Sequence, residues 1–120
     1  MPAKPTDLTA PQIYNSLLRC FRRDDKAAPL FERIQTVPGL WVLELAGPHR
    51  ETWSSWLRKV RRVLTRHKAT LKGLRAGSKD YTLHVAMTTT CGLLDVVIPP
   101  SLSELLSETG INLEISYQSE

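Results

Sequence analysis

The stretch PHRETWSSWLRKVRRVLTRHKATLKGLR, from Pro48 to Arg75, is the part of the sequence that decides the fold. Its apolar side chains and one histidine recur at spacings of three and four residues, which is the period of one face of an α-helix. These positions are Trp53, Leu57, Val60, Leu64, His67, Leu71 and Leu74, with Trp56 and Val63 at the edge of the stripe. The pattern predicts one long helix with a single face in the core.

The other side of this predicted helix is basic. It carries Arg58, Lys59, Arg61, Arg62, Arg66, Lys68 and Lys72. Glu51 is the only acidic residue in the stretch, so few ion pairs within the helix can neutralise these charges. Nucleic acid, an acidic protein partner and an anionic membrane surface are all attracted by such a face, and charge alone does not choose among them.

The length of 120 residues predicts one domain, residues 1–120, with a hydrophobic core of its own. The fractions of hydrophobic (42%) and charged (23%) residues are typical of globular proteins, and the net charge is +4. No run approaches the roughly 18 apolar residues of a membrane span, and the N-terminus lacks the apolar core of a secretion signal. We therefore expect a cytoplasmic protein that does not contact membrane. Cys20 and Cys91 form no CxxC pair, so two buried thiols and no metal site are expected.

The first third of the chain is predicted to precede the main fold. Residues 1–7 are expected to be a flexible N-terminus, and residues 8–38 a helix followed by an irregular segment between prolines. Thr9 as N-cap, with Gln12 three residues later, predicts a helix that runs to about Arg22. This helix is expected to bury Ile13, Leu17 and either Cys20 or Phe21.

Residues 39–118 are predicted to form a βαββαβ core. The expected order is strand, long helix, two strands, short helix and strand, at residues 40–46, 48–75, 81–87, 93–98, 101–110 and 111–117. The short helix has a capping box at Ser101–Glu104 and a C-cap at Gly110, and residues 88–92 are short enough for a hairpin connection. This order is typical of the ferredoxin-like, or split βαβ, fold. We therefore expect an α+β domain: a four-stranded antiparallel sheet with two helices on one face, preceded by an extra N-terminal helix.

The sheet face opposite the helices is a second place to look for function. Alternation along the strands assigns to this face Val42, Glu44, Thr82, His84, Asp95, Val97, Asn112 and Glu114. His84 can there meet Glu44, Asp95 or Glu114 of a neighbouring strand, an arrangement suited to proton transfer. Cross-strand pairing at the surface accounts for the same residues without catalysis, and we favour it.

Residues 7–118 resemble a bacterial family known only as a domain of unknown function. The resemblance lies in the entry DLTAPQI at residues 7–13, a strand with a tryptophan, a leucine-rich helix, and the motifs PSLSELL and GINLEIS at residues 100–106 and 110–116. These motifs are helix caps, turns and core positions. The resemblance therefore supports an α+β fold and implies no catalytic or binding residues.

Motifs of the common enzyme classes are missing from the sequence. It contains no GxGxxG, GxxxxGK[ST], GxSxG or HExxH pattern, and its three histidines lie far apart. The aromatic motif of single-strand RNA readers is missing as well. We therefore expect no enzyme activity and no cofactor. Trp53, Trp56 and His67 are interpreted as core residues, although a partly exposed Trp56 would be an anchor for a protein interface.

The function predicted from the sequence is a small protein-binding module without enzyme activity. In its narrower form it is an immunity-type or inhibitor protein that neutralises a toxin or effector by direct association. The predicted contact residues are Arg58, Lys59, Arg61, Arg62, Arg66, Lys68, Lys72 and Trp56, and the expected partner is an acidic protein. The alternative is a nucleic-acid-binding protein that contacts phosphates with the same helix face. A solvated helix surface without a partner explains the charges too, because Lys and Arg are good helix formers.

Overall fold

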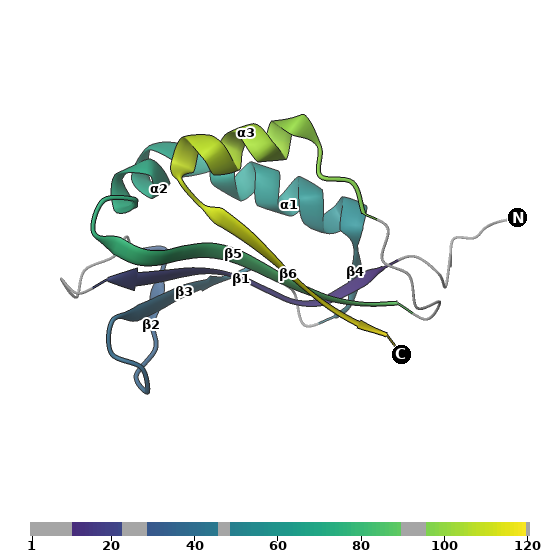
Figure 1. The fold of residues 1–120 in the computed structure, drawn as a ribbon, viewed down its shortest axis with the longest axis horizontal. Helices are drawn as coiled ribbons and strands as arrows, with labels where there is room; N and C mark the ends of the chain where they lie inside the picture. Colours follow the sequence, from purple (N-terminus) through teal and green to yellow (C-terminus); the bar gives the residue numbers. More distant parts are fainter. Residues whose placement is uncertain (1–10, 23–28, 46–48, 90–95, 120) are drawn as a thin grey trace, which may run out of the picture.

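The chain folds into two layers, a mixed β-sheet and a layer of helices on one of its faces (Figure 1). The computed structural model describes residues 11–22, 29–45, 49–89 and 96–119. Within these ranges the elements are β1 (Gln12–Arg22), β2 (Glu32–Arg33), β3 (Leu40–Glu44), β4 (Glu51–Thr52), α1 (Trp53–Arg66), α2 (Lys68–Leu74), β5 (Ser78–Thr89), α3 (Pro100–Thr109) and β6 (Asn112–Ser119). The flexible N-terminus expected at residues 1–7 lies outside the described residues.

The sheet has the order β2-β3-β1-β5-β6, and the short β4 pairs with one end of β1. β1 is antiparallel to both β3 and β5, whereas β5 and β6 are parallel. Two parallel neighbours need a crossover connection, and α3 lies in the connection between β5 and β6. The described part of the chain is therefore an α+β structure with six strands and three helices.

The predicted fold class is wrong in the type of sheet and in the expected N-terminal helix. The expected four-stranded antiparallel, ferredoxin-like sheet is replaced by a six-stranded mixed sheet, because the chain returns from α3 parallel to β5. The strand expected at 93–98 is not part of this sheet where the chain is described: residues 90–95 lie outside the described ranges, and residues 96–99 are irregular. The hairpin expected at 88–92 falls partly on the same segment, and its first two residues belong to β5.

The predicted N-terminal helix is also wrong, because Gln12–Arg22 is strand β1 at the centre of the sheet. Ile13, Leu17 and Cys20 fit a helical period, but Ser16, Leu18 and Cys20 also alternate with the period of a strand. Leu18 and Cys20 are completely buried, and β1 pairs along its length with both β3 and β5. Tertiary pairing therefore overrides the local helix signals. The proposed cap at Thr9 lies outside the described residues.

Other predicted elements are confirmed with shifted ends. β3, β5, α3 and β6 lie where strands and a helix were expected. The long helix is present but is broken at His67, which separates α1 from α2 with backbone angles φ −109° and ψ 20°. α3 begins at Pro100 after Pro99, so the capping box predicted at Ser101 is wrong, while Gly110 is its C-cap at φ 74°.

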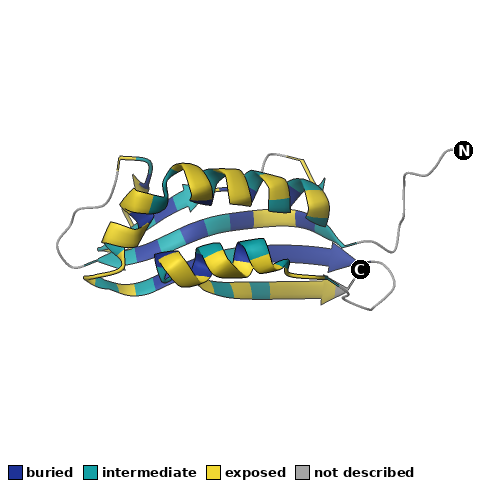
Figure 2. Cartoon of the chain, turned by 90° about the horizontal axis from the view of Figure 1, so that it is seen from above, coloured by how far each residue is buried: buried dark blue, intermediate teal, exposed yellow. Residues whose placement is uncertain are grey.

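The core lies between the helices and the sheet, where the apolar stripe predicted for residues 48–75 is buried (Figure 2). Trp56, Val60, Leu64 and Leu71 are fully buried against residues of β1 and β5 such as Leu83. Trp53 stacks on Trp56 with 4.9 Å between ring centroids. The stripe therefore accounts for one face of α1 and α2, and the opposite face remains at the surface.

Candidate binding surface on helix α1

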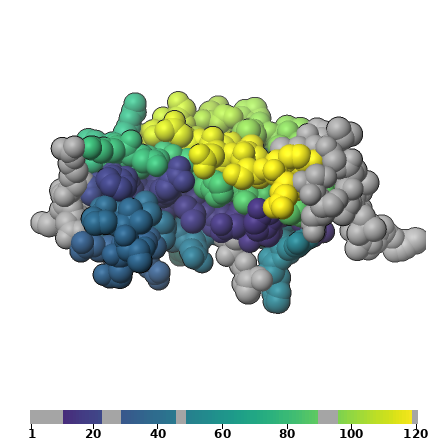
Figure 3. Space-filling view, turned by 60° about the horizontal axis from the view of Figure 1, so that its bottom comes forward, coloured from purple at the N-terminus to yellow at the C-terminus, as the bar shows by residue number. Residues whose placement is uncertain are grey.

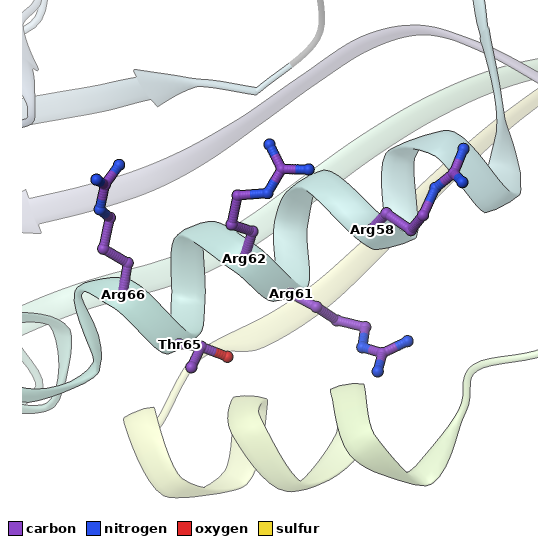
Figure 4. A pocket seen from close by; sticks show the side chains of 5 residues that line it. All are labelled: Arg58, Arg61, Arg62, Thr65 and Arg66. Atoms are coloured by element: carbon purple, nitrogen blue, oxygen red, sulfur yellow. The ribbon is translucent and has the colours of Figure 1, made fainter.

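The exposed side of α1 carries four arginines, which we call the arginine face: Arg58, Arg61, Arg62 and Arg66. α1 begins after Thr52, whose hydroxyl oxygen accepts a hydrogen bond from the Ser55 backbone N–H at 3.2 Å. Residues four apart lie one above the other on a helix, so Arg58, Arg62 and Arg66 form a row about 12 Å long. Figure 4 shows this row on one side of α1, with Arg61 and Thr65 directed toward α3. Together these five residues line an open hollow.

The four guanidinium groups are not neutralised by their surroundings. Among the described residues, none of the four takes part in a hydrogen bond or an ion pair. The first turn of α1 contains no acidic residue that could pair with them from within the helix. Guanidinium groups held at the surface without partners are available to carboxylates or phosphates of another molecule.

The other residues predicted for the contact surface lie in different environments. Lys59 pairs with Glu51 at 2.8 Å and donates to the Leu45 carbonyl at 2.7 Å, so it holds the start of α1 to the sheet. Lys68 pairs with Glu108 of α3 at 2.5 Å, and Lys72 is exposed on α2. The ammonium groups of Lys59 and Lys68 are therefore already engaged within the chain.

Trp56 does not belong to the surface. Its side chain is completely buried, and its indole N–H donates to Ser16 Oγ at 2.8 Å. Trp56 therefore lies on the side of α1 that faces β1. The prediction that Trp56 contacts a partner is therefore withdrawn, and its interpretation as a core residue is confirmed.

Helix α3 brings negative charge beside the arginine face. α3 packs against both α1 and α2, and its exposed side carries Glu104 and Glu108, of which Glu108 is paired with Lys68. The outer surface of the helical layer is therefore mixed in sign, with arginines on one helix and glutamates on its neighbour. The sequence analysis expected two helices on one face of the sheet, but it did not consider the negative charge that the second helix brings to this surface.

The sheet face opposite the helices carries a second polar cluster. Pairing registers place Val42, Arg19, Thr82 and Asn112 in one row across the sheet, and Glu44, Leu17, His84 and Glu114 in the next. The assignment of Val42, Glu44, Thr82, His84, Asn112 and Glu114 to this face is thus confirmed. Asp95 lies outside the described residues, and Val97 is an exposed residue of an irregular segment.

The charges of this cluster are directed at one another. His84 Nδ1 lies 2.8 Å from Glu114 Oε1, and Arg19 Nη1 lies 3.7 Å from the same oxygen. Arg19 Nε is 2.9 Å from Asp80 Oδ2, but its N–H is not aimed at that oxygen, so the contact is an ion pair without a hydrogen bond. The Thr82 hydroxyl donates to Asp80 at 2.6 Å. Arg19 was missed because a residue of a predicted helix was not considered for the sheet.

An imidazole and a carboxylate at 2.8 Å satisfy the first geometric requirement of a proton-transfer pair. A reacting group and a third residue that orients it are also needed, and Leu17 separates His84 from Glu44 in their row. The hydroxyl nearest in the adjoining row, that of Thr82, is used by Asp80. Within the described residues no group of three or more His, Cys, Asp or Glu side chains is placed to hold a metal ion. The cluster is best explained as cross-strand pairing that ties β1, β5 and β6 together.

Comparison of the chain with protein-family models, with curated proteins and with solved structures finds no match. The resemblance of the helix caps and turns to a bacterial domain of unknown function therefore stays a prediction. In the described ranges, no helix combines the length and the apolar character that crossing a bilayer requires.

Proposed function

We propose that this protein is a binding module that associates with an acidic protein partner through the arginine face of α1. The observation that carries the proposal is the set of four exposed guanidinium groups, Arg58, Arg61, Arg62 and Arg66, without partners among the described residues. Arginine forms bidentate hydrogen bonds to carboxylates, which gives geometry as well as charge to a contact. Aspartate and glutamate side chains of a partner helix or loop are suitable ligands for this row.

The neighbouring helix favours a protein partner over nucleic acid. A nucleic-acid backbone is a continuous polyanion, and it would lie close to Glu104 and Glu108 if it followed the helical layer. A protein partner can present carboxylates to α1 and basic or neutral groups to α3. Complementary patterns of both signs give specificity in protein association and exclude partners of the wrong pattern.

An immunity-type or inhibitor protein is one kind of module that works by such association. This narrower hypothesis is supported by the small size of the chain and by the charged surface. It predicts that the partner is a toxin or effector. Affinity capture from the source cell should then recover a toxin or effector, whose activity falls when this protein is bound.

A titration against random-sequence DNA and RNA separates the two classes of partner. The proposal expects weak binding by fluorescence anisotropy at low salt and none at moderate salt, because the exposed Glu104 of α3 opposes phosphate contacts. Tight binding with a steep salt dependence and little sequence preference would instead assign the arginine face to nucleic acid and overturn the proposal.

A further inference from the structure

The two edges of the sheet are built differently. The edge at β2 consists of two residues, Glu32 and Arg33, which are both charged and exposed. A short, charged edge strand resists pairing with another chain. The opposite edge is β6, which spans Asn112–Ser119 and, among the described residues, pairs with β5 alone. Only the β2 edge therefore carries the usual protection.

Strand β6 has the features of an edge that accepts another strand. Its register with β5 runs from Thr82↔Asn112 to Thr89↔Ser119 without a shift, so no bulge bends it away. Its sequence NLEISYQS contains neither proline nor lysine. Figure 2 shows β6 as the outermost strand, exposed or half-buried over residues 112–118, and Figure 3 shows it at the surface in yellow. These properties are those of an unprotected edge.

The one charged residue of β6, Glu114, does not prevent another strand from pairing with this edge. Glu114 Oε1 lies 2.8 Å from His84 Nδ1 on β5 and 3.7 Å from Arg19 Nη1 on β1, so its carboxylate is drawn across the sheet. On the helix side of β6, Leu113 and Ile115 are half-buried and Tyr117 is 38% exposed. Their neighbours Leu83, Val85 and Met87 on β5 are completely buried. The apolar row of β6 therefore lacks the cover that an additional strand would provide.

We propose that β6 pairs antiparallel with β6 of a second copy of this chain, which joins the two sheets in a closed dimer. The argument is the complementarity of β6 with itself. With the twofold axis at Ile115, Leu113 lies opposite Tyr117 of the second copy, and Glu114 lies opposite Ser116. Directly opposed residues of antiparallel strands share a face, so apolar residues meet apolar ones and Glu114 lies opposite a small polar residue.

Neighbouring registers are less favourable. An axis at Glu114 would place two carboxylates directly opposite one another, which is repulsive. An axis at Ser116 would leave Leu113 without an apolar residue opposite it. The other strands at the margin of the described sheet, β2 and β4, have only two residues each, so pairing through β6 consumes the long edge strand and should stop at two copies. This inference is independent of the function proposed for α1.

Charge substitutions at Ser116 test both the dimer and its register. We expect the full chain to sediment as a monomer–dimer equilibrium with no larger species. Ser116→Glu places a carboxylate opposite Glu114 of the other copy twice per dimer, and should raise the dimer dissociation constant about tenfold. Ser116→Lys should lower it, since each lysine then lies opposite a glutamate.

Gln118→Glu is the matched control, because it adds the same charge as Ser116→Glu but lies opposite Asn112, and it should leave dimerisation nearly unchanged. Ser116 and Gln118 are exposed, so thermal unfolding should confirm that all three variants fold. The proposal would be overturned if the chain is a monomer at every concentration or assembles beyond two copies. It would also be overturned if glutamate and lysine at position 116 change the dimer dissociation constant equally.

Discussion

At the scale of single residues, a short hydrogen-bonded chain connects the helical layer to the sheet. The Trp56 indole donates to Ser16 Oγ, and the Ser16 hydroxyl donates to the His84 carbonyl, both at 2.8 Å. Ser16 is 1% exposed, so water cannot take the place of its hydroxyl as the partner of the Trp56 N–H and the His84 carbonyl. The hydroxyl of one buried serine therefore satisfies two polar groups of the core.

Replacing this serine should destabilise the fold. Ser16→Ala leaves the buried Trp56 N–H without an acceptor, and the free energy of unfolding should fall by about 1 to 3 kcal/mol in urea denaturation. Ser54→Ala, at an exposed position of α1, is the control and should change this free energy by less than about 0.5 kcal/mol. Equal stability of Ser16→Ala and the wild type would show that the hydrogen-bonded chain contributes nothing.

Tyr81 makes the free energy of unfolding depend on pH in the alkaline range. Burial of the ring raises the pKa of its hydroxyl well above the usual value of about 10; the nearby Cys20 thiol adds to this rise and Arg22 opposes it. The hydroxyl also donates to the Leu71 carbonyl at 2.8 Å. In the unfolded chain the Tyr81 hydroxyl loses its proton near pH 10, whereas in the folded protein the hydroxyl is still protonated at this pH. The stabilising contribution is therefore complete below pH 10 and is lost as the pH rises further.

Comparison with Tyr81→Phe isolates this effect. At neutral pH the variant should be less stable by about 1 kcal/mol, because it lacks the hydrogen bond to Leu71. Above pH 10 the difference in unfolding free energy between wild type and variant should narrow, which denaturant titrations at several pH values measure. A difference that stays constant or widens across this range would contradict the shifted pKa.

Sequence reasoning at this scale identified the pair of His84 with a carboxylate, and Glu114 was among the three candidates. Strand alternation was sufficient, because both residues lie in segments whose type was predicted correctly. Arg19 was missed because its segment was assigned to a helix, and Trp56 was left open because it sits at the edge of the apolar stripe. A residue such as Arg19 could therefore be placed correctly only where the type of its element had been predicted correctly.

At the scale of elements, two glycines of the helical layer have opposite structural roles. Gly110 is the C-cap of α3 at φ +74°, and a Cβ there would lie 2.5 Å from Arg75 Cδ. Gly73 lies in α2, and nothing is within 4 Å of the position of a Cβ. A left-handed backbone requires glycine, whereas a glycine inside a helix mainly adds entropy to the unfolded chain.

The two alanine variants should therefore change stability in opposite directions. Gly110→Ala should lower the free energy of unfolding by about 1 to 2 kcal/mol, because alanine is strained in the left-handed region. Gly73→Ala should raise it by about 0.5 to 1 kcal/mol. Thermal and urea unfolding of both variants measure the difference, and destabilisation by Gly73→Ala would show that α2 is not the helix described.

The same scale explains which elements were predictable. α3 and β6 were found because the C-cap at Gly110 and the alternation of residues 111–117 are local signals. β1 was mistaken for a helix because Ile13, Leu17 and Cys20 fit a period of three to four, and only pairing with β3 and β5 decides for a strand. The break at His67 left no signal, since the apolar stripe continues through it.

At the scale of the whole molecule, the error in β1 changed the architecture. With β1 at the centre of the sheet and β6 parallel to β5, a four-stranded antiparallel arrangement is replaced by a mixed sheet. α3, which lies in this crossover, packs beside α1 and carries Glu104 and Glu108 on its exposed side. The basic stretch was visible in the sequence, but the mixed charge pattern of the finished surface depends on the topology.

The central claim, that the arginine face binds a protein partner, is tested most directly by comparing three immobilised forms of the chain. They are the wild type, Arg58→Gln with Arg62→Gln, and the control Arg75→Gln with Lys79→Gln, which removes two positive charges at exposed positions outside the arginine face. Circular dichroism should show that all three fold, because every substituted side chain is exposed.

Proteins retained from a lysate of the source cell are then quantified on each form by mass spectrometry. We predict a partner that is retained by the wild type and by the control, and whose retention falls at least about tenfold on the Arg58 and Arg62 variant, as the loss of two charge-assisted contacts requires. Equal retention of the same proteins by all three forms would contradict the claim.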